Sequence, residues 1–142
     1  MNELHPFIIE SIRDGGQFVF YPSGISMKPT ILPDEDCVIL VEADNLKRYD
    51  LVLFTRDDGK YVLHRIMKIN NGQYTIKGDN QNWTETTTDE KIIAKVSEIR
   101  KKDGRVITSD EFTSAKTVAR LECIKFMRRV INKLKRIIKG EK

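Results

Sequence analysis

The chain has 142 residues, of which 39% are apolar and 32% are charged, and its formal net charge is +4. This composition is typical of one folded domain with a single core, and it excludes a disordered or low-complexity chain. No stretch approaches the roughly 20 apolar residues of a membrane-spanning helix, and residues 1–16 lack the features of a signal peptide. We therefore expect a cytoplasmic protein, or one attached peripherally to the inner face of the membrane.

The chain begins with a short helical pattern over residues 3–13, which Gly15 and Gly16 end. Its apolar side chains are expected near one side of the helix: Leu4, Phe7, Ile8 and Ile12. We assign residues 1–16 to an N-terminal helical arm that lies on the protein or on a membrane surface.

Runs rich in Val, Ile, Phe and Tyr follow, divided by turn sequences such as Asp57-Asp58-Gly59 and Asn70-Asn71-Gly72. The expected strands cover residues 17–21, 36–42, 50–56, 60–69 and 73–77, a sixth run at 91–99, and Val106-Ile107. Short strands spaced by turns predict a mainly β fold, twisted and partly closed, over residues 17–108.

From about Asp110 the apolar period changes to three and four, which predicts a long C-terminal helix within residues 109–142. Residues 120–142 contain nine Lys/Arg and two Glu, whereas the rest of the chain carries 16 basic and 19 acidic residues. The apolar set is Val118, Met127, Val130, Ile131, Leu134, Ile137 and Ile138, and the opposite face carries Arg128, Arg129, Lys133, Lys135, Arg136 and Lys139.

Three interpretations of this basic amphipathic helix stay open. Its apolar side packs on the β domain or pairs with another helix, or residues 118–139 bind an anionic membrane surface. Nucleic acid is the weakest option, because few aromatic residues interleave with the charges, and we expect no nucleic-acid partner.

The two cysteines, Cys37 and Cys123, lie far apart, one in an apolar run and one in a helical pattern. Both are interpreted as buried thiols rather than a disulfide. The histidines, His5 and His64, do not complete a Cys/His cluster at a familiar spacing. The sequence therefore predicts no metal and no cofactor.

The most informative stretch is Tyr21–Thr30, in which Ser26 lies between a glycine-containing turn and a proline directly after an apolar run. Such a turn holds a hydroxyl out of a sheet and leaves backbone N–H groups beside it unpaired. Three further segments follow at a distance: Tyr49–Phe54, Val62–Ile66 and Ile76–Asn80.

In this order, the four segments resemble the sequence boxes of signal peptidases and of the self-cleaving LexA-type repressors, over about residues 18–100. The resemblance implies a Ser26 nucleophile. His64 stands where bacterial-type signal peptidases and LexA-type proteins have a lysine, and where endoplasmic-reticulum-type and archaeal signal peptidases have a histidine. A histidine of ordinary pKa, about 6.5, suits a general base without a large shift.

Asp79 matches the acidic box of the family, which implies that it orients the imidazole. Histidine-type relatives carry a second aspartate a few residues further on, where this chain departs from the pattern. Glu85 is the candidate substitute there, and Arg65 beside the base is a possible support. The spacing of the serine box is closer to the LexA type, which implies an oxyanion site at the backbone N–H groups of Ile25 and Ser26, with Ser23 as an open candidate.

The resemblance implies a serine endopeptidase that cleaves an extended peptide with small side chains next to the scissile bond. We expect a leader or signal segment of a specific precursor as its substrate. Two alternatives remain: a LexA-like self-cleaving regulator, although no Ala-Gly or Cys-Gly precedes Ser26, and a catalytically silent peptide-binding or membrane-surface module of the same fold.

Overall fold

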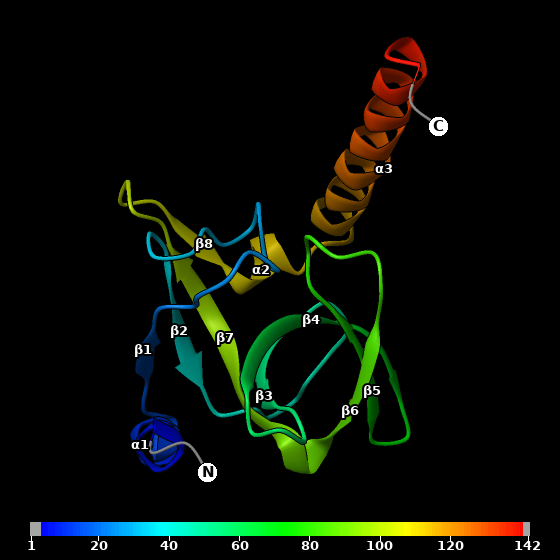
Figure 1. The fold of residues 1–142 in the computed structure, drawn as a ribbon. Coiled ribbons are helices and arrows are strands. Elements are labelled where there is room, and N and C mark those ends of the chain that lie inside the picture. Colours follow the sequence, from blue (N-terminus) through cyan, green and yellow to red (C-terminus); the bar gives the residue numbers. More distant parts are fainter. Residues whose placement is uncertain (1–3, 141–142) are drawn as a thin grey trace.

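A computed structural model describes residues 4–140, and its centre is an antiparallel sheet with helices before and after it (Figure 1). The strands are β1 (Phe18–Phe20), β2 (Cys37–Val41), β3 (Leu51–Thr55), β4 (Tyr61–Asn70), β5 (Gln73–Lys77), β6 (Glu85–Thr88), β7 (Ile92–Arg100) and β8 (Val106–Thr108). The helices are α1 (Leu4–Ile12), α2 (Ser109–Phe112) and α3 (Ala115–Ile138), with single 3-10 turns at Arg13–Gly15 and Asp89–Lys91.

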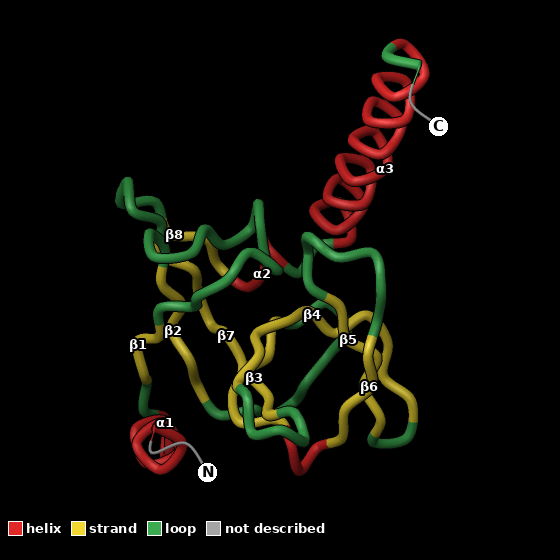
Figure 2. Tube along the Cα trace, in the orientation of Figure 1, coloured by secondary structure: helices red, strands yellow, loops and turns green. Residues whose placement is uncertain are grey.

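The sheet has the strand order β1-β2-β7-β3-β4-β5-β6, with β8 paired to β7. It curls strongly, but among the described residues β1 and β6 each pair with one neighbour, so the sheet is not closed (Figures 1 and 2). The predicted fold class, mainly β with a short N-terminal helix and a C-terminal helix, is confirmed. The strand β6 was not expected, because its sequence Glu-Thr-Thr-Thr has no apolar residue.

Two tight turns place β4 between its neighbours. Gly59 and Gly72 have φ angles of 83° and 78°, and Asn71 has a φ of 49°, as Asp-Gly and Asn-Gly sequences accommodate. In the resulting register His64 on β4 faces Val52 on β3, and β4 pairs with β5 on its other side. The longest strand of the sheet is thereby held along both edges.

The larger of two buried clusters joins α1, the loop after β1, and the strands. Ile8 and Ile12 contribute from α1, and Met27 and Ile31 from the loop that carries the candidate nucleophile. Phe7 does not share this face as expected, because it is 64% exposed, and Leu4 and Ile9 complete the packed side instead. A second cluster lies among β3, β4, β5 and β7, and it includes Val52, Phe54, Ile66 and Ile76.

The C-terminal segment forms two helices rather than the single helix expected. They are separated at Thr113 and Ser114, and the Ser114 hydroxyl caps α3 by accepting a hydrogen bond from the Thr117 N–H at 3.1 Å. α3 projects away from the sheet (Figure 1), and only Val118, Leu121 and Lys125 of its residues are buried.

The rest of α3 decides against one open alternative and corrects one expectation. The apolar side chains of its outer half do not pack on the β domain, since every residue from Phe126 to Gly140 is exposed. Cys123 is exposed, whereas Cys37 is buried as expected. None of the described helices is long and apolar enough to cross a membrane.

Candidate active site

Ser26 lies in the loop between β1 and β2, and the local sequence sets its position. Gly24 has a φ of 81°, which permits the turn that precedes the serine. Directly after the serine, the Met27 side chain is buried, and the Ile31 N–H donates to the Met27 carbonyl oxygen at 3.0 Å. The loop is thus anchored in the core on one side of Ser26 and turned by glycine on the other.

A second loop, residues 78–81, holds the serine loop from outside. The Asn80 N–H donates to the Ser26 carbonyl at 2.8 Å, and the Asn80 side-chain amide donates to the Ile25 carbonyl at 3.1 Å. Gly78 allows this approach, because a Cβ there would lie 2.6 Å from the Ser26 carbonyl oxygen. The Gly-Asp-Asn sequence therefore fixes the backbone of the candidate nucleophile.

Asp79, in the same loop, is buried and pairs with Arg65 rather than with the imidazole. Its two oxygens accept hydrogen bonds from Arg65 Nε and Nη2, each at 2.8 Å, and the Thr30 hydroxyl also donates to it. Arg65 donates in addition to the carbonyl oxygens of Tyr49 and Phe112. The expected contact between Asp79 and the imidazole is absent from the described part of the chain, because both carboxylate oxygens are engaged elsewhere.

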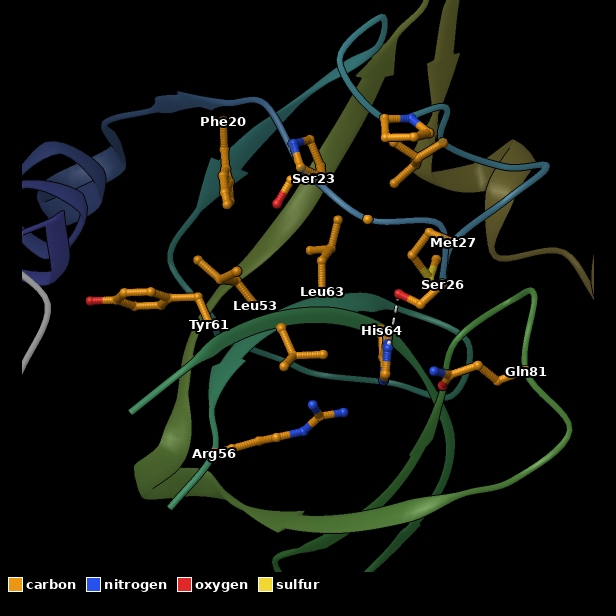
Figure 3. Close-up of a pocket in the computed structure, with 15 residues that line it drawn as sticks. Phe20, Ser23, Ser26, Met27, Leu53, Arg56, Tyr61, Leu63, His64 and Gln81 are labelled. Carbon is orange, nitrogen blue, oxygen red and sulfur yellow. Dashed lines mark hydrogen bonds between the residues drawn. The ribbon is translucent and has the colours of Figure 1, made fainter. Parts of the chain in front are cut away.

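His64, the candidate base, lies beside the Ser26 hydroxyl (Figure 3). Its Nε2 lies 3.2 Å from Ser26 Oγ, within hydrogen-bond distance, and the ring packs against Phe54 with centroids 5.9 Å apart. The side chain is only 2% exposed. Within the described residues its Nδ1 has no hydrogen-bond partner, but Glu85 Oε1 lies 3.5 Å away. Glu85, and not Asp79, is therefore the carboxylate beside the imidazole.

Burial dominates the electrostatics of this histidine. It lowers the pKa of His64 from 6.5 to about 4, with Arg56 acting in the same direction, and the nearby Glu85 and Asp79 carboxylates partly oppose the shift. At neutral pH the imidazole is consequently uncharged and able to accept a proton. A hydrogen on Nδ1 would face the Glu85 carboxylate, which favours the tautomer whose Nε2 is free to accept from the serine.

Arg56, at the end of β3, is a member of the site that the sequence interpretation missed. Its Nη2 lies 2.9 Å from Glu85 Oε1, and its Nε contacts the same carboxylate at 3.2 and 3.3 Å. This pair fixes Glu85 at the start of β6, behind the histidine. No local sequence pattern indicates this pair, because the two residues are 29 positions apart and β3, which Arg56 directly follows, does not pair with β6.

The expected oxyanion donors are available. Among the described residues, neither the Ile25 nor the Ser26 backbone N–H donates a hydrogen bond. Ser23 lines the cavity beside them, and its hydroxyl points towards the cavity in Figure 3.

The cavity in front of the serine has a volume of about 190 Å³. Ser26, His64 and Gln81 lie at one end of it, and the rest is lined by both apolar and polar side chains, which include Leu53, Leu63, Ser23 and Arg56 (Figure 3). No group of three or more His, Cys, Asp or Glu side chains in the described chain is arranged to hold a metal ion.

A family model described as Peptidase S24-like matches residues 5–97, which is more than half of the chain. The chain belongs to the Peptidase S24-like family. The match covers the serine loop, the histidine strand and loop 78–81 of this S24-like domain. A search of curated proteins and a search of solved structures found no match.

Proposed function

We propose that this S24-like protein is a serine endopeptidase in which Ser26 is the nucleophile and His64 the general base. The observation that carries the proposal is the 3.2 Å separation of Ser26 Oγ and His64 Nε2 at one end of a cavity. A serine hydroxyl needs a base at this distance to become a nucleophile at neutral pH. Glu85 is assigned the orienting role that the sequence suggested for Asp79, since Glu85 lies beside Nδ1.

In the proposed reaction, Ser26 Oγ adds to the carbonyl carbon of the scissile bond while its proton moves to His64 Nε2. The negative charge on the substrate oxygen is stabilised by the free N–H groups of Ile25 and Ser26. Collapse of this intermediate breaks the C–N bond, and the imidazolium gives its proton to the leaving amine. Water then adds to the acyl group on Ser26, with His64 again accepting the proton, and the acid product leaves.

The Arg56–Glu85 pair tunes the strength of the base. The buried imidazole of His64 is uncharged at neutral pH and can therefore accept a proton. Its low pKa also means that its affinity for the serine proton is weak. As positive charge develops on the ring, the Glu85 carboxylate at 3.5 Å stabilises it. Arg56 opposes this effect while it holds Glu85 in place, so the two side chains together set the proton affinity of His64.

We propose an extended peptide as the substrate, with a small side chain beside the scissile bond. Support comes from the size of the cavity, since about 190 Å³ is close to the cavities of about 150 Å³ that admit one benzene molecule. In the described chain β1 pairs only with β2, so its outer edge is open to an added strand. A leader or signal segment of a precursor peptide fits this description.

The test is cleavage of a peptide library by the full chain, read by mass spectrometry, with Ser26→Ala and His64→Ala as paired variants. Cuts made by the wild type and lost in both variants are expected, and their positions give the side-chain preference. Denaturation curves of the variants provide the control for folding.

Cuts that persist in Ser26→Ala would refute the assigned nucleophile. If the wild type binds peptides and cuts none of them, the protein is a silent binding module. A self-cleaving regulator would instead show a time-dependent loss of intact mass that Ser26→Ala abolishes.

A further inference from the structure

The outer half of α3 carries apolar side chains that no described part of the protein covers. Every residue from Phe126 to Gly140 is exposed, and Leu134 and Ile137 are 53% and 62% exposed. We call these apolar side chains the α3 stripe, and its members are Ile124, Phe126, Met127, Val130, Ile131, Leu134, Ile137 and Ile138.

The stripe is continuous and separate from the charges. At about 100° per residue, its members fall within an arc of about 160° of the helix, and no charged side chain between positions 123 and 139 enters that arc. Over the same positions, 123–139, the remaining arc holds seven basic side chains and no acidic one: Lys125, Arg128, Arg129, Lys133, Lys135, Arg136 and Lys139.

The stripe faces away from the protein's own domain. The side chains of α3 that are buried against the domain, Val118, Leu121 and Lys125, are centred about 180° from the stripe around the helix axis. Lys125 Nζ donates to the Gln81 carbonyl at 2.8 Å, and Arg128 donates to the Asn80 side chain at 3.2 Å. A flat surface could therefore meet the stripe while the domain stays on the other side of the helix.

The charges decide which kind of surface fits. Lys133 borders the stripe on one side, and Lys135 and Arg128 border it on the other. Two copies paired through their stripes would bring these like charges together with no carboxylate between positions 123 and 139 to pair with them. An anionic lipid surface offers both the apolar layer for the stripe and negative headgroups for its basic borders.

We propose that α3 docks the protein on the surface of an anionic lipid bilayer, with the stripe in the apolar layer and the basic side chains at the headgroups. The docking rests on α3 alone and does not depend on the chemistry of Ser26. The helix lies along the surface and does not cross it.

The experiment is co-sedimentation of the full chain with vesicles of phosphatidylcholine, with or without about one third phosphatidylglycerol. We expect the wild type to bind the anionic vesicles at least about tenfold more tightly than the neutral ones. Ile131→Gln/Leu134→Gln in the stripe should weaken binding to anionic vesicles by about tenfold or more. Arg129→Gln/Lys133→Gln should reduce the preference for anionic vesicles.

The matched control is Ile69→Gln/Val106→Gln, which removes two apolar side chains of similar exposure, 38% and 48%, from the β domain. It should bind vesicles like the wild type. Circular dichroism identifies any variant that loses helix, and the charge variant then tests the proposal without altering the stripe.

Absence of wild-type binding to anionic vesicles, or equal binding by the stripe variant with its helix intact, would overturn the proposal. Sedimentation equilibrium without lipid tests the alternative, in which the stripe binds a second copy of the chain. A wild-type dimer that the stripe variant dissociates, together with no vesicle binding, would assign the stripe to a second copy of the chain.

Discussion

Acidification should weaken this fold through one buried side chain, His64. The folded protein lowers the pKa of this imidazole from 6.5 to about 4, mainly by burial, so between these values the unfolded chain binds more protons than the folded one. The contribution of this group to the free energy of unfolding is therefore fully present above pH 6.5. It is lost as the pH falls from 6.5 to about 4. Integrated over the window, the loss is about 3 kcal/mol of unfolding free energy.

Urea unfolding followed by circular dichroism, at pH 7 and at pH 4, measures this loss. The comparison is between wild type and His64→Gln, because the carboxylates common to both chains contribute similarly and largely cancel in the difference. We expect the wild type to lose about 3 kcal/mol more than the variant on acidification. The lower stability of His64→Gln at pH 7 does not affect this difference.

The matched control is Ser26→Ala, which keeps the buried imidazole and should follow the pH dependence of the wild type. Equal losses for wild type and His64→Gln would refute the reasoning. They would mean that water reaches the imidazole in the folded protein, and the neutral buried base of the proposed mechanism would then have no physical basis.

Three further predictions concern the surroundings of the serine and histidine. Arg56→Met should raise the pKa of the imidazole and Glu85→Gln should lower it, which NMR titration of the histidine ring and the acid limb of kcat/KM both measure. Gly78→Ala should lower kcat/KM by about 10²-fold, because its Cβ would displace the Ser26 carbonyl, while urea unfolding shows a loss of about 1–3 kcal/mol. Asp79→Asn should lower the free energy of unfolding by about 3–5 kcal/mol in the same assay, because the buried Arg65 guanidinium loses its ion pair. An unchanged stability together with a shifted imidazole pKa would instead support Asp79 as the residue that orients His64.

Most strands follow from local sequence, for a simple physical reason. β-branched and aromatic residues fill the sheet, and the turns at Gly59 and Gly72 need the positive φ that glycine provides. The strand Glu85–Thr88 differs because, within the described residues, it pairs with β5 alone and its side chains are polar. Backbone hydrogen bonds at the edge of the sheet hold this strand, so its sequence shows no alternation of apolar and polar residues from which it could be predicted.

The same limit applies to the carboxylates of the site. Motif order was enough to pair Ser26 with His64, but motif order does not determine which carboxylate reaches the imidazole. His64 and Arg65 are consecutive on β4, so their side chains point to opposite faces of the strand. Asp79 is bound to Arg65 and is thereby separated from the ring, whereas Glu85 arrives on a strand that the sequence did not predict.

In α3 the expectation that Val118 and Met127 share one face of the helix was wrong. It counted residue spacings of three and four without adding up the rotation around the helix axis. Val118 and Met127 are nine residues apart, which at about 100° per residue is two and a half turns. They therefore lie on opposite sides of the helix, and Val118 is buried while Met127 is 49% exposed. The spacing of apolar and basic residues predicts the amphipathic character of such a helix, but the packing of its first turns decides which side remains exposed.

Loop 78–81 contacts both the loop that carries Ser26 and the helix α3. It donates to the Ser26 carbonyl through Asn80, and its Gln81 carbonyl accepts from the buried ammonium of Lys125 on α3. Burial lowers the pKa of Lys125, so its hydrogen bonds to Gln81 and Glu122 are needed to keep the charge satisfied. Removing α3 would leave the Gln81 carbonyl without this donor and would disturb the serine loop together with the stripe. Substitutions in the exposed half of α3 keep these contacts, so they can test the proposed membrane docking separately from the proposed catalysis, whereas a truncation would affect both.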